Sequence, residues 1–239
     1  MTEKKYILSH DTGTGGDKAV LTDLRGRILH SHYQPYPVLY PRPEWAEQDP
    51  DALWRAVAAT TRQVIQAAGI DPDEILGVGI SAQMFNLLPV DENVQPLTPM
   101  LSWLDVRSVA QADRLLQGDL PSFLFQHTGN IPTAKDVIPK ILWLKEERPD
   151  LWKRTAHLLD CKEYILHRLT GRLATDYHGA SVYFLFDPHR RAWSKEVCHA
   201  LGIPIEMLPP APPCTQVMGE VTPEAARQTG LSPGTPVVA

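Results

Sequence analysis

The sequence is poor in cysteine and lacks both long apolar runs and long basic runs. Its 239 residues include only three cysteines, Cys161, Cys198 and Cys214, whose wide spacing argues against a disulfide framework or a paired-cysteine metal site. No apolar stretch approaches the ~20 residues that span a bilayer. The net charge of −5, with no Lys or Arg run longer than a pair, argues against a nucleic-acid-binding surface. We therefore expect a cytoplasmic protein with reduced thiols that binds neither nucleic acid nor membrane.

The first third of the sequence predicts strands followed by one long helix. Short strands at residues 6–10, 19–22 and 28–33 are joined by turns that contain Gly, which is typical of an antiparallel meander. The helix that follows has clear ends: Asp49 is a good N-cap, Pro50 suits the first helical position, and Gly69 can close the last turn.

The remainder of the chain combines strands and helices. We expect a buried strand at 75–80, shorter strands at 85–90 and 100–103, and helices at 106–117, 135–147, 161–169, 194–201 and 223–229. This order indicates mixed α/β layering. Residues 234–239 predict a turn that enters a buried strand for which the sequence shows no partner. Since domains rarely end in this way, we expect the chain to be part of a longer protein.

A glycine-rich loop joins the first two predicted strands, with the sequence Asp11-Thr12-Gly13-Thr14-Gly15-Gly16. It connects strand to strand, so it differs from the Walker and Rossmann loops, which lead into a helix. Glycines permit positive φ and allow backbone N–H groups to converge on a phosphate. Asp11 could hold hydrated Mg²⁺ beside that phosphate, and Thr14 adds a hydroxyl donor. The alternative is a plain hairpin whose Asp11 caps the turn.

Polar and aromatic residues follow two of the later predicted strands. Gln83 and Met84 come after the buried strand, and Trp103, Asp105 and Arg107 alternate where a strand gives way to a helix. The ends of buried strands are where open sheets bind ligands. Trp offers an apolar face to the C–H side of a sugar, while Asp and Arg can bind its hydroxyls. The alternative is a core Trp beside an exposed Asp–Arg pair at a helix start.

Taken together, these stretches resemble the N-terminal domain of the FGGY carbohydrate kinase family. The resemblance covers essentially the whole chain in order, through the segments at 11–19, 47–54, 79–84, 103–107, 140–145, 169–171, 175–177 and 229–238. It implies an α/β fold of the actin-like (ribonuclease H-like) ATPase type, a mixed sheet with flanking helices. In this family two such domains flank a cleft, and the second domain holds most of the ATP.

The resemblance implies a role for each group of residues. The family transfers the γ-phosphoryl group of ATP to a hydroxyl of a sugar or polyol, so ATP and Mg²⁺ are the implied cofactors. Asp11 would be the catalytic residue that organises the metal. The residues implied to lie at the ATP phosphates are Thr12, Gly13, Thr14, Gly15, Gly16 and Lys18. The residues implied to line the sugar pocket are Gln83, Met84, Trp103, Asp105 and Arg107.

The sequence departs from the family's pattern in two ways. The xylulose kinases of the family typically have Gln-Met-His-Gly where this chain has Gln83-Met84-Phe85-Asn86, so xylulose is one candidate among pentoses, hexoses and polyols. The family's general base, an Asp in a Gly-Gly-x-Asp stretch, would follow Ala239, as would the ATP-binding domain. We therefore interpret residues 1–239 as the N-terminal, sugar-binding domain and expect this chain alone to be inactive.

The oligomeric state and the choice between a kinase and a non-catalytic protein stay open at this point. The expected partners are a sugar or polyol and the C-terminal domain of the same protein, and the resemblance leaves homodimer formation open. The alternative to a kinase is a non-catalytic sugar-binding or regulatory module derived from one, which would bind sugar without hydrolysing ATP.

Overall fold

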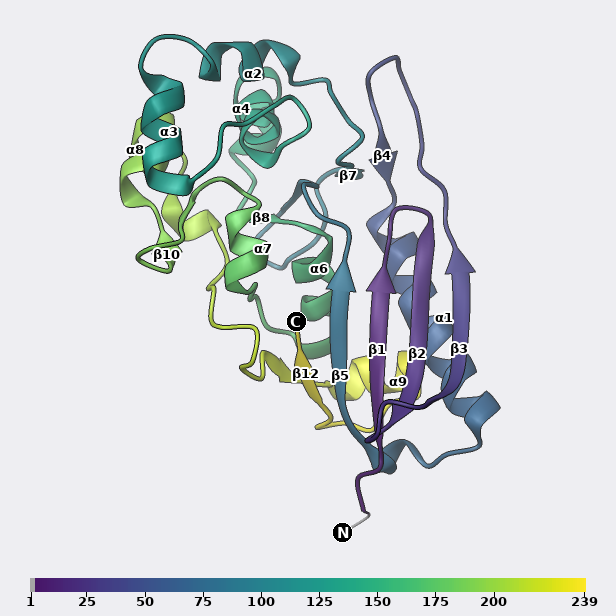
Figure 1. The fold of residues 1–239 in the computed structure, drawn as a ribbon. Helices are drawn as coiled ribbons and strands as arrows, with labels where there is room; N and C mark the ends of the chain where they lie inside the picture. Colours follow the sequence, from purple (N-terminus) through teal and green to yellow (C-terminus); the bar gives the residue numbers. More distant parts are fainter. Residues whose placement is uncertain (1–2) are drawn as a thin grey trace.

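The centre of the structure is a six-stranded mixed sheet (Figure 1). The computed structural model describes residues 3–239. Across the sheet the strands are β11 (Gly219–Glu220), β12 (Pro236–Val238), β5 (Ile75–Ala82), β1 (Tyr6–Thr12), β2 (Gly16–Asp23) and β3 (Ile28–Pro35). The strands β1, β2 and β3 are antiparallel, whereas β5 is parallel to both β1 and β12. The predicted meander and the mixed sheet are confirmed.

Helix α1 (Pro50–Ala68) has the ends that its sequence predicts. The side chain of Asp49 accepts a hydrogen bond from the N–H of Asp51, and Gly69 closes the helix in the left-handed region at φ 63°. Helices α6 (Cys161–Thr170) and α9 (Pro223–Thr229) pack beside α1 on the same face of the sheet (Figure 1). Together these helices and the sheet enclose one hydrophobic core.

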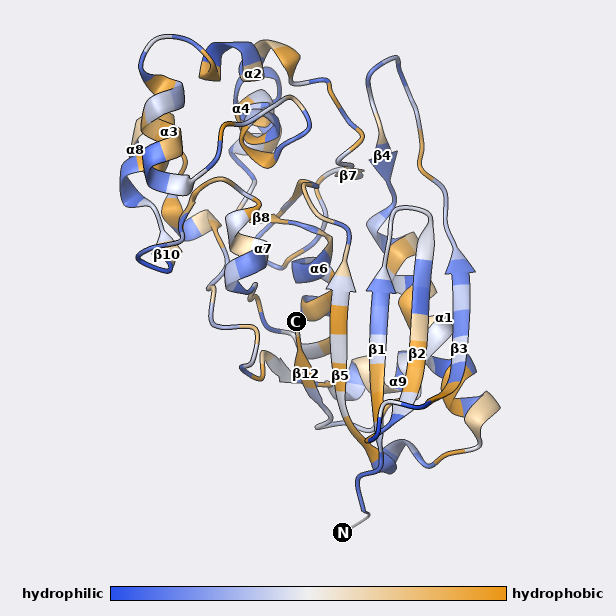
Figure 2. Ribbon diagram, in the orientation of Figure 1, coloured by the Kyte–Doolittle hydropathy of each residue, from blue (hydrophilic) through white to orange (hydrophobic). Residues whose placement is uncertain are grey.

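Side chains along β1 are alternately buried in the core and exposed on the other face of the sheet. Leu8, His10 and Thr12 are buried, whereas Ser9 and Asp11 are exposed, because successive side chains of a strand point to opposite faces. Figure 2 shows that β1 is hydrophilic toward its carboxyl end, whereas β5 carries hydrophobic bands. Asp11 therefore lies on the face of the sheet opposite α1, close to the carboxyl end of β1.

A second group of helices lies beyond the carboxyl ends of β1 and β5 and has its own hydrophobic core (Figure 1). Its helices are α2 (Val109–Leu115), α3 (Leu120–Thr128), α4 (Val137–Glu147), α5 (Pro149–Trp152), α7 (Tyr177–Ser181) and α8 (Lys195–Leu201). Three two-stranded sheets complete the strands. They pair β4 (Glu47–Gln48) with β7 (Met100–Leu101), β6 (Leu88–Val90) with β8 (His157–Leu159), and β9 (Phe186–Asp187) with β10 (Ala192–Trp193). Two 3₁₀ turns, Pro72–Glu74 and Ile205–Met207, complete the elements.

The structure corrects several expectations. The last strand does have partners, because β12 pairs with β5 on one side and with β11 on the other. The strand expected at 85–90 begins only at Leu88, since Phe85 adopts a left-handed φ of 65° that an extended strand does not allow. The helix expected at 106–117 covers only Val109–Leu115. Across residues 3–239, no helix is both long and apolar enough to cross a membrane.

Candidate functional site

A cavity lies where β1 and β5 end side by side. Because the two strands are parallel, their carboxyl ends meet at one edge of the sheet, which is where open α/β sheets bind ligands. The cavity has a volume of about 320 Å³ and is lined by Asp11, Gly13, Thr14, Ala82, Gln83, Met84, Phe85 and Trp103. The structure thus brings together six of the predicted site residues: Asp11, Gly13, Thr14, Gln83, Met84 and Trp103.

Asp11 and Lys18 face each other across the first hairpin. They are directly opposed in the register of β1 and β2, and both are exposed, so their side chains share one face of the sheet. Only Asp11 of the two lines the cavity. In the described part of the chain, residues 3–239, no cluster of three or more His, Cys, Asp or Glu side chains could hold a metal ion. A metal at this site would therefore have few protein ligands.

A buried polar network supports the end of β1 from the core side. The carboxylate of Asp17 accepts hydrogen bonds from Thr12 (2.8 Å) and Thr60 (2.5 Å) and lies 3.0 Å from Nδ1 of His10. Burial acts to raise the pKa of Asp17, but the contacts with His10, Thr60 and Thr12 outweigh it and lower the pKa. The structure therefore places the Thr12 side chain in the core, whereas its predicted place at the ATP phosphates stays a prediction.

The glycines of the loop have a different explanation from the one that the sequence suggested. None of Gly13, Gly15 and Gly16 lies among the left-handed glycines of the described residues, so positive φ is not the reason for them. A Cβ on Gly16 would lie 2.5 Å from the carbonyl oxygen of Gln34 in β3, so the close approach of the strands requires glycine there. The loop is closed by a hydrogen bond from the Gly13 N–H to the Gly16 carbonyl, at 2.9 Å.

Side chains from distant segments tie this loop to the rest of the cavity. The indole N–H of Trp103 donates to the Thr14 hydroxyl at 2.9 Å. The buried Gln48 donates to the Thr14 carbonyl at 2.9 Å and accepts from the Gln83 amide at 2.7 Å. Sequence reasoning included Gln48 in the family-like segment 47–54 but did not assign it to the site. It also missed Phe85 as a cavity residue.

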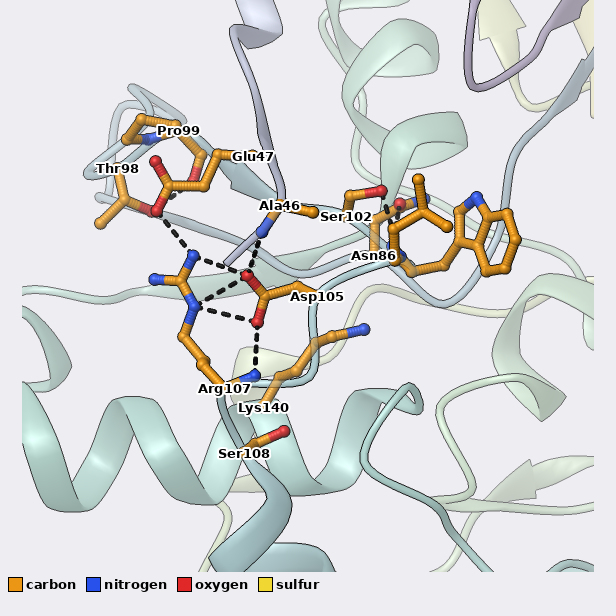
Figure 3. A network of polar contacts seen from close by, with 12 residues as sticks. Ala46, Glu47, Asn86, Thr98, Pro99, Ser102, Asp105, Arg107, Ser108 and Lys140 are labelled. Carbon is orange, nitrogen blue, oxygen red and sulfur yellow. Dashed lines mark hydrogen bonds and ion pairs between the residues drawn. The ribbon is translucent and has the colours of Figure 1, made fainter. Parts of the chain in front are cut away.

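Asp105 and Arg107 form a buried pair behind the cavity and do not line it (Figure 3). The Arg107 guanidinium donates to both Asp105 oxygens at 2.9 Å and to Glu47 at 2.7 Å. Asp105 also accepts from the N–H of Ala46 at 2.7 Å, and the Trp45 ring covers the guanidinium at 3.5 Å. The alternative of an exposed Asp–Arg pair is wrong, because the side chains of Asp105 and Arg107 are only 0% and 3% exposed. Contact of both residues with sugar stays a prediction, and neither lines the cavity in this structure.

A larger hollow lies elsewhere in the molecule, beside α1 and β3. It has a volume of about 540 Å³, and its walls include Tyr36, Trp54, Arg62 and Gln228. None of the predicted site residues lines it, so the smaller cavity at the ends of β1 and β5 is the candidate site.

Comparisons with known proteins agree with this geometry. The sequence model for the FGGY family of carbohydrate kinases, N-terminal domain, matches residues 6–239. The chain is 30% identical to a xylulose kinase of Bacillus subtilis, over 98% of this chain and 47% of that protein. It is 32% identical to a xylulose kinase of Klebsiella pneumoniae, over 93% of this chain and 45% of that protein. A gluconate kinase structure from Lactobacillus acidophilus is 27% identical and has a TM-score of 0.92, over 98% of this chain and 47% of that one.

The chain belongs to the FGGY family of carbohydrate kinases and corresponds to its N-terminal domain. Its mixed sheet with flanking helices is the actin-like ATPase fold that the sequence predicted. The chain spans about half the length of the curated relatives it matches.

Proposed function

We propose that the protein of which this chain is part is an ATP-dependent kinase that phosphorylates a hydroxyl of a sugar or polyol. The observation that carries the proposal is the single cavity in which Asp11 and the glycine-rich loop lie beside Gln83, Met84, Phe85 and Trp103. Phosphoryl transfer depends mainly on positioning and on charge neutralisation. A site that places a metal-organising carboxylate next to a shaped pocket supports this chemistry.

Asp11 is the residue that we assign to Mg²⁺. It is exposed, lines the cavity and lies opposite Lys18. Mg²⁺ usually keeps several waters and binds one or two carboxylates together with substrate phosphates, and a single cavity carboxylate fits that pattern. Bound Mg²⁺ would neutralise charge on the transferring phosphoryl group. The loop from Gly13 to Gly16 and the exposed amine of Lys18 would then lie at the phosphates of ATP.

The sugar would lie against Trp103, with Gln83 at the floor of the cavity. An indole ring offers an apolar face to sugar C–H groups, and hydrogen bonding to Thr14 fixes the orientation of this one. Met84 and Phe85 make the remaining wall apolar. Relatives that are named for xylulose and for gluconate support an open-chain or ring sugar of five or six carbons as the substrate class. Direct sugar contacts by Asp105 and Arg107 stay a prediction that the cavity lining does not favour.

The rest of the catalytic machinery is assigned to the part of the protein that this chain does not include. Its relatives are about twice as long, which supports a second domain that holds most of the ATP and supplies the general base. Residues 1–239 are then the sugar-binding domain, and the proposed use of ATP is consistent with a cytoplasmic enzyme. Homodimer formation stays a prediction that light scattering tests. The kinase relatives favour this function over a non-catalytic module.

The test is an ADP-formation assay on the complete protein with ATP, Mg²⁺ and a panel of pentoses, hexoses, aldonates and polyols. We expect sugar-dependent ADP formation with at least one member of the panel and its loss when EDTA removes Mg²⁺. If no member of the panel supports ADP formation above the sugar-free rate, the proposal is wrong. If one binds without ADP formation, the non-catalytic module is the better explanation.

A further inference from the structure

One peptide group in the wall of the cavity is held at both ends by buried ionisable side chains. The group joins Phe85, which lines the cavity, to the fully buried Asn86. Its carbonyl oxygen accepts from Nζ of Lys140 at 2.8 Å, and its N–H donates to Oδ2 of Asp160 at 3.2 Å. A cation at the oxygen and an acidic group at the N–H both favour this orientation of the peptide dipole.

The two side chains come from helices in different cores, because α4 belongs to the second group of helices and α6 packs against the sheet. Lys140 is a fully buried residue of α4 and also donates to the carbonyl of Lys135. Asp160 is the N-cap of α6, where a capping box with Glu163 fixes it. Because both helices are packed in hydrophobic cores, neither end of the clamped peptide can move without disturbing a helix.

Nearby carboxylates oppose the effect of burial on the pKa of Lys140. Burial lowers its pKa to about 8, whereas Asp105, Asp160 and Asp136 act to raise the pKa and Arg107 acts to lower it. An ammonium group in this position is a stronger donor to a carbonyl than a neutral amine would be.

Asn86 extends the clamp to Trp103, which also lines the cavity. Its side-chain amide donates to Asp160 at 2.6 Å, and its side-chain oxygen accepts from the backbone N–H of Trp103 at 3.0 Å. Figure 3 shows Asn86, Lys140 and the buried Asp105 in one close view. The clamp thus reaches both aromatic walls, Phe85 directly and Trp103 through Asn86.

Phe85 needs such support because of its backbone. Its φ of 65° lies in the left-handed region, which a bulky residue adopts only where its surroundings enforce it. Its ring packs edge to face against Phe184 at 6.1 Å, so both its backbone and its ring are held.

We propose that Lys140, Asp160 and Asn86 are positioning residues for the sugar pocket, which hold Phe85 and Trp103 at the spacing that selects the sugar. The inference rests on the proposed function, because it assigns the cavity to the sugar. It concerns substrate selection, and none of the three residues lines the cavity or touches the reacting atoms.

The test compares Lys140→Met and Asn86→Ala with the control Leu144→Ala in the complete protein. Leu144 is equally buried in α4 and does not line the cavity, so it reports loss of stability alone. We expect both clamp variants to raise KM for the sugar about tenfold or more and to reduce the discrimination between the best sugar and the next. KM for ATP should stay at the wild-type value, and Leu144→Ala should leave both KM values unchanged.

Hydrogen exchange gives a second readout that does not need activity. In both clamp variants the segment at 84–87 should exchange faster than in wild type, whereas in Leu144→Ala it should not. The proposal is wrong if both clamp variants keep the wild-type sugar KM and selectivity. It is also wrong if Leu144→Ala changes them to the same extent. Unchanged exchange would overturn it as well. A wild-type enzyme that phosphorylates no sugar would refute the proposed function instead, while faster exchange in the variants would still support the clamp.

Discussion

Replacing Asp17 by Ala tests the buried network beneath the candidate site. Asp17 is fully buried and receives contacts from His10, Thr12 and Thr60 at 3.0, 2.8 and 2.5 Å. Because His10 and Thr12 are the chain neighbours of Asp11, the network fixes the strand end from which Asp11 reaches the cavity. Removing the carboxylate takes one partner from each of these three buried groups, and Thr60 keeps only its bond to the Val57 carbonyl.

The size of the effect follows from these contacts. A hydrogen bond to a charged group contributes about 1.5–3 kcal/mol, and such contributions are not additive within one network. Leaving a buried polar group without its hydrogen-bond partner costs about 1–3 kcal/mol. Because the substitution removes three such contacts at once, we expect Asp17→Ala to lower the free energy of unfolding by about 3–5 kcal/mol. At about 2–4 °C for each kcal/mol, the melting temperature should fall by roughly 6–20 °C.

The assay is denaturant and thermal unfolding of the chain followed by circular dichroism at pH 7. Asp113→Ala, an exposed residue of α2, is the control and should change stability by no more than about 0.5 kcal/mol. The pKa of Asp17 is lowered from 3.8, so its contribution is complete above pH 3.8 and is lost as the pH falls through the folded-state pKa. A loss below about 1 kcal/mol at pH 7 would refute the reasoning.

Three further changes test other parts of the site. Trp103→Ala should weaken sugar binding to the complete protein roughly tenfold and leave ATP binding unchanged, and calorimetry measures both affinities. An unchanged sugar affinity would mean that Trp103 has only a packing role. Gly16→Ala places a Cβ 2.5 Å from a backbone oxygen and should lower the free energy of unfolding by about 1–3 kcal/mol. Gly13→Ala, whose Cβ would have its nearest atom at 3.6 Å, should lower it less. Equal decreases in the free energy of unfolding would contradict the packing argument. Burial and the nearby Glu163 raise the pKa of Asp160 from 3.8 to about 7, so the folded state holds a proton that the unfolded state releases. As the pH rises from 3.8 to about 7, the wild type should therefore lose stability relative to Asp160→Asn. If the unfolding free energies of the two proteins differ by a constant amount over this range, the pKa of Asp160 is not raised.

Local signals in the sequence predicted the parts of the structure that depend on neighbouring residues. The cap at Asp49, Pro50 in the first turn and the left-handed Gly69 define α1 as expected. The cavity also follows from local patterns, because a glycine-rich turn and the polar break around Gln83 mark the ends of two strands that prove to be parallel neighbours.

The sequence could not predict features that depend on distant partners. Arg107 is buried because Glu47 and Trp45, some sixty residues earlier in the chain, surround it, and no local pattern shows this. The partner of the last strand is β5, about 160 residues earlier. Lys140 would be read as an exposed helix residue from its charge, yet it is buried because Phe85 and Lys135 offer it two carbonyls.

The most direct test of the proposed function is turnover by Asp11→Asn in the complete protein, with Asp113→Asn as the matched control. Asp11 lines the cavity, whereas Asp113 is an exposed residue of α2. We predict that Asp11→Asn lowers the rate of sugar-dependent ADP formation about a hundredfold or more and leaves the Kd for sugar close to that of wild type. The control should match wild type in both measurements. Near-normal turnover by Asp11→Asn would contradict the assignment of this cavity to phosphoryl transfer.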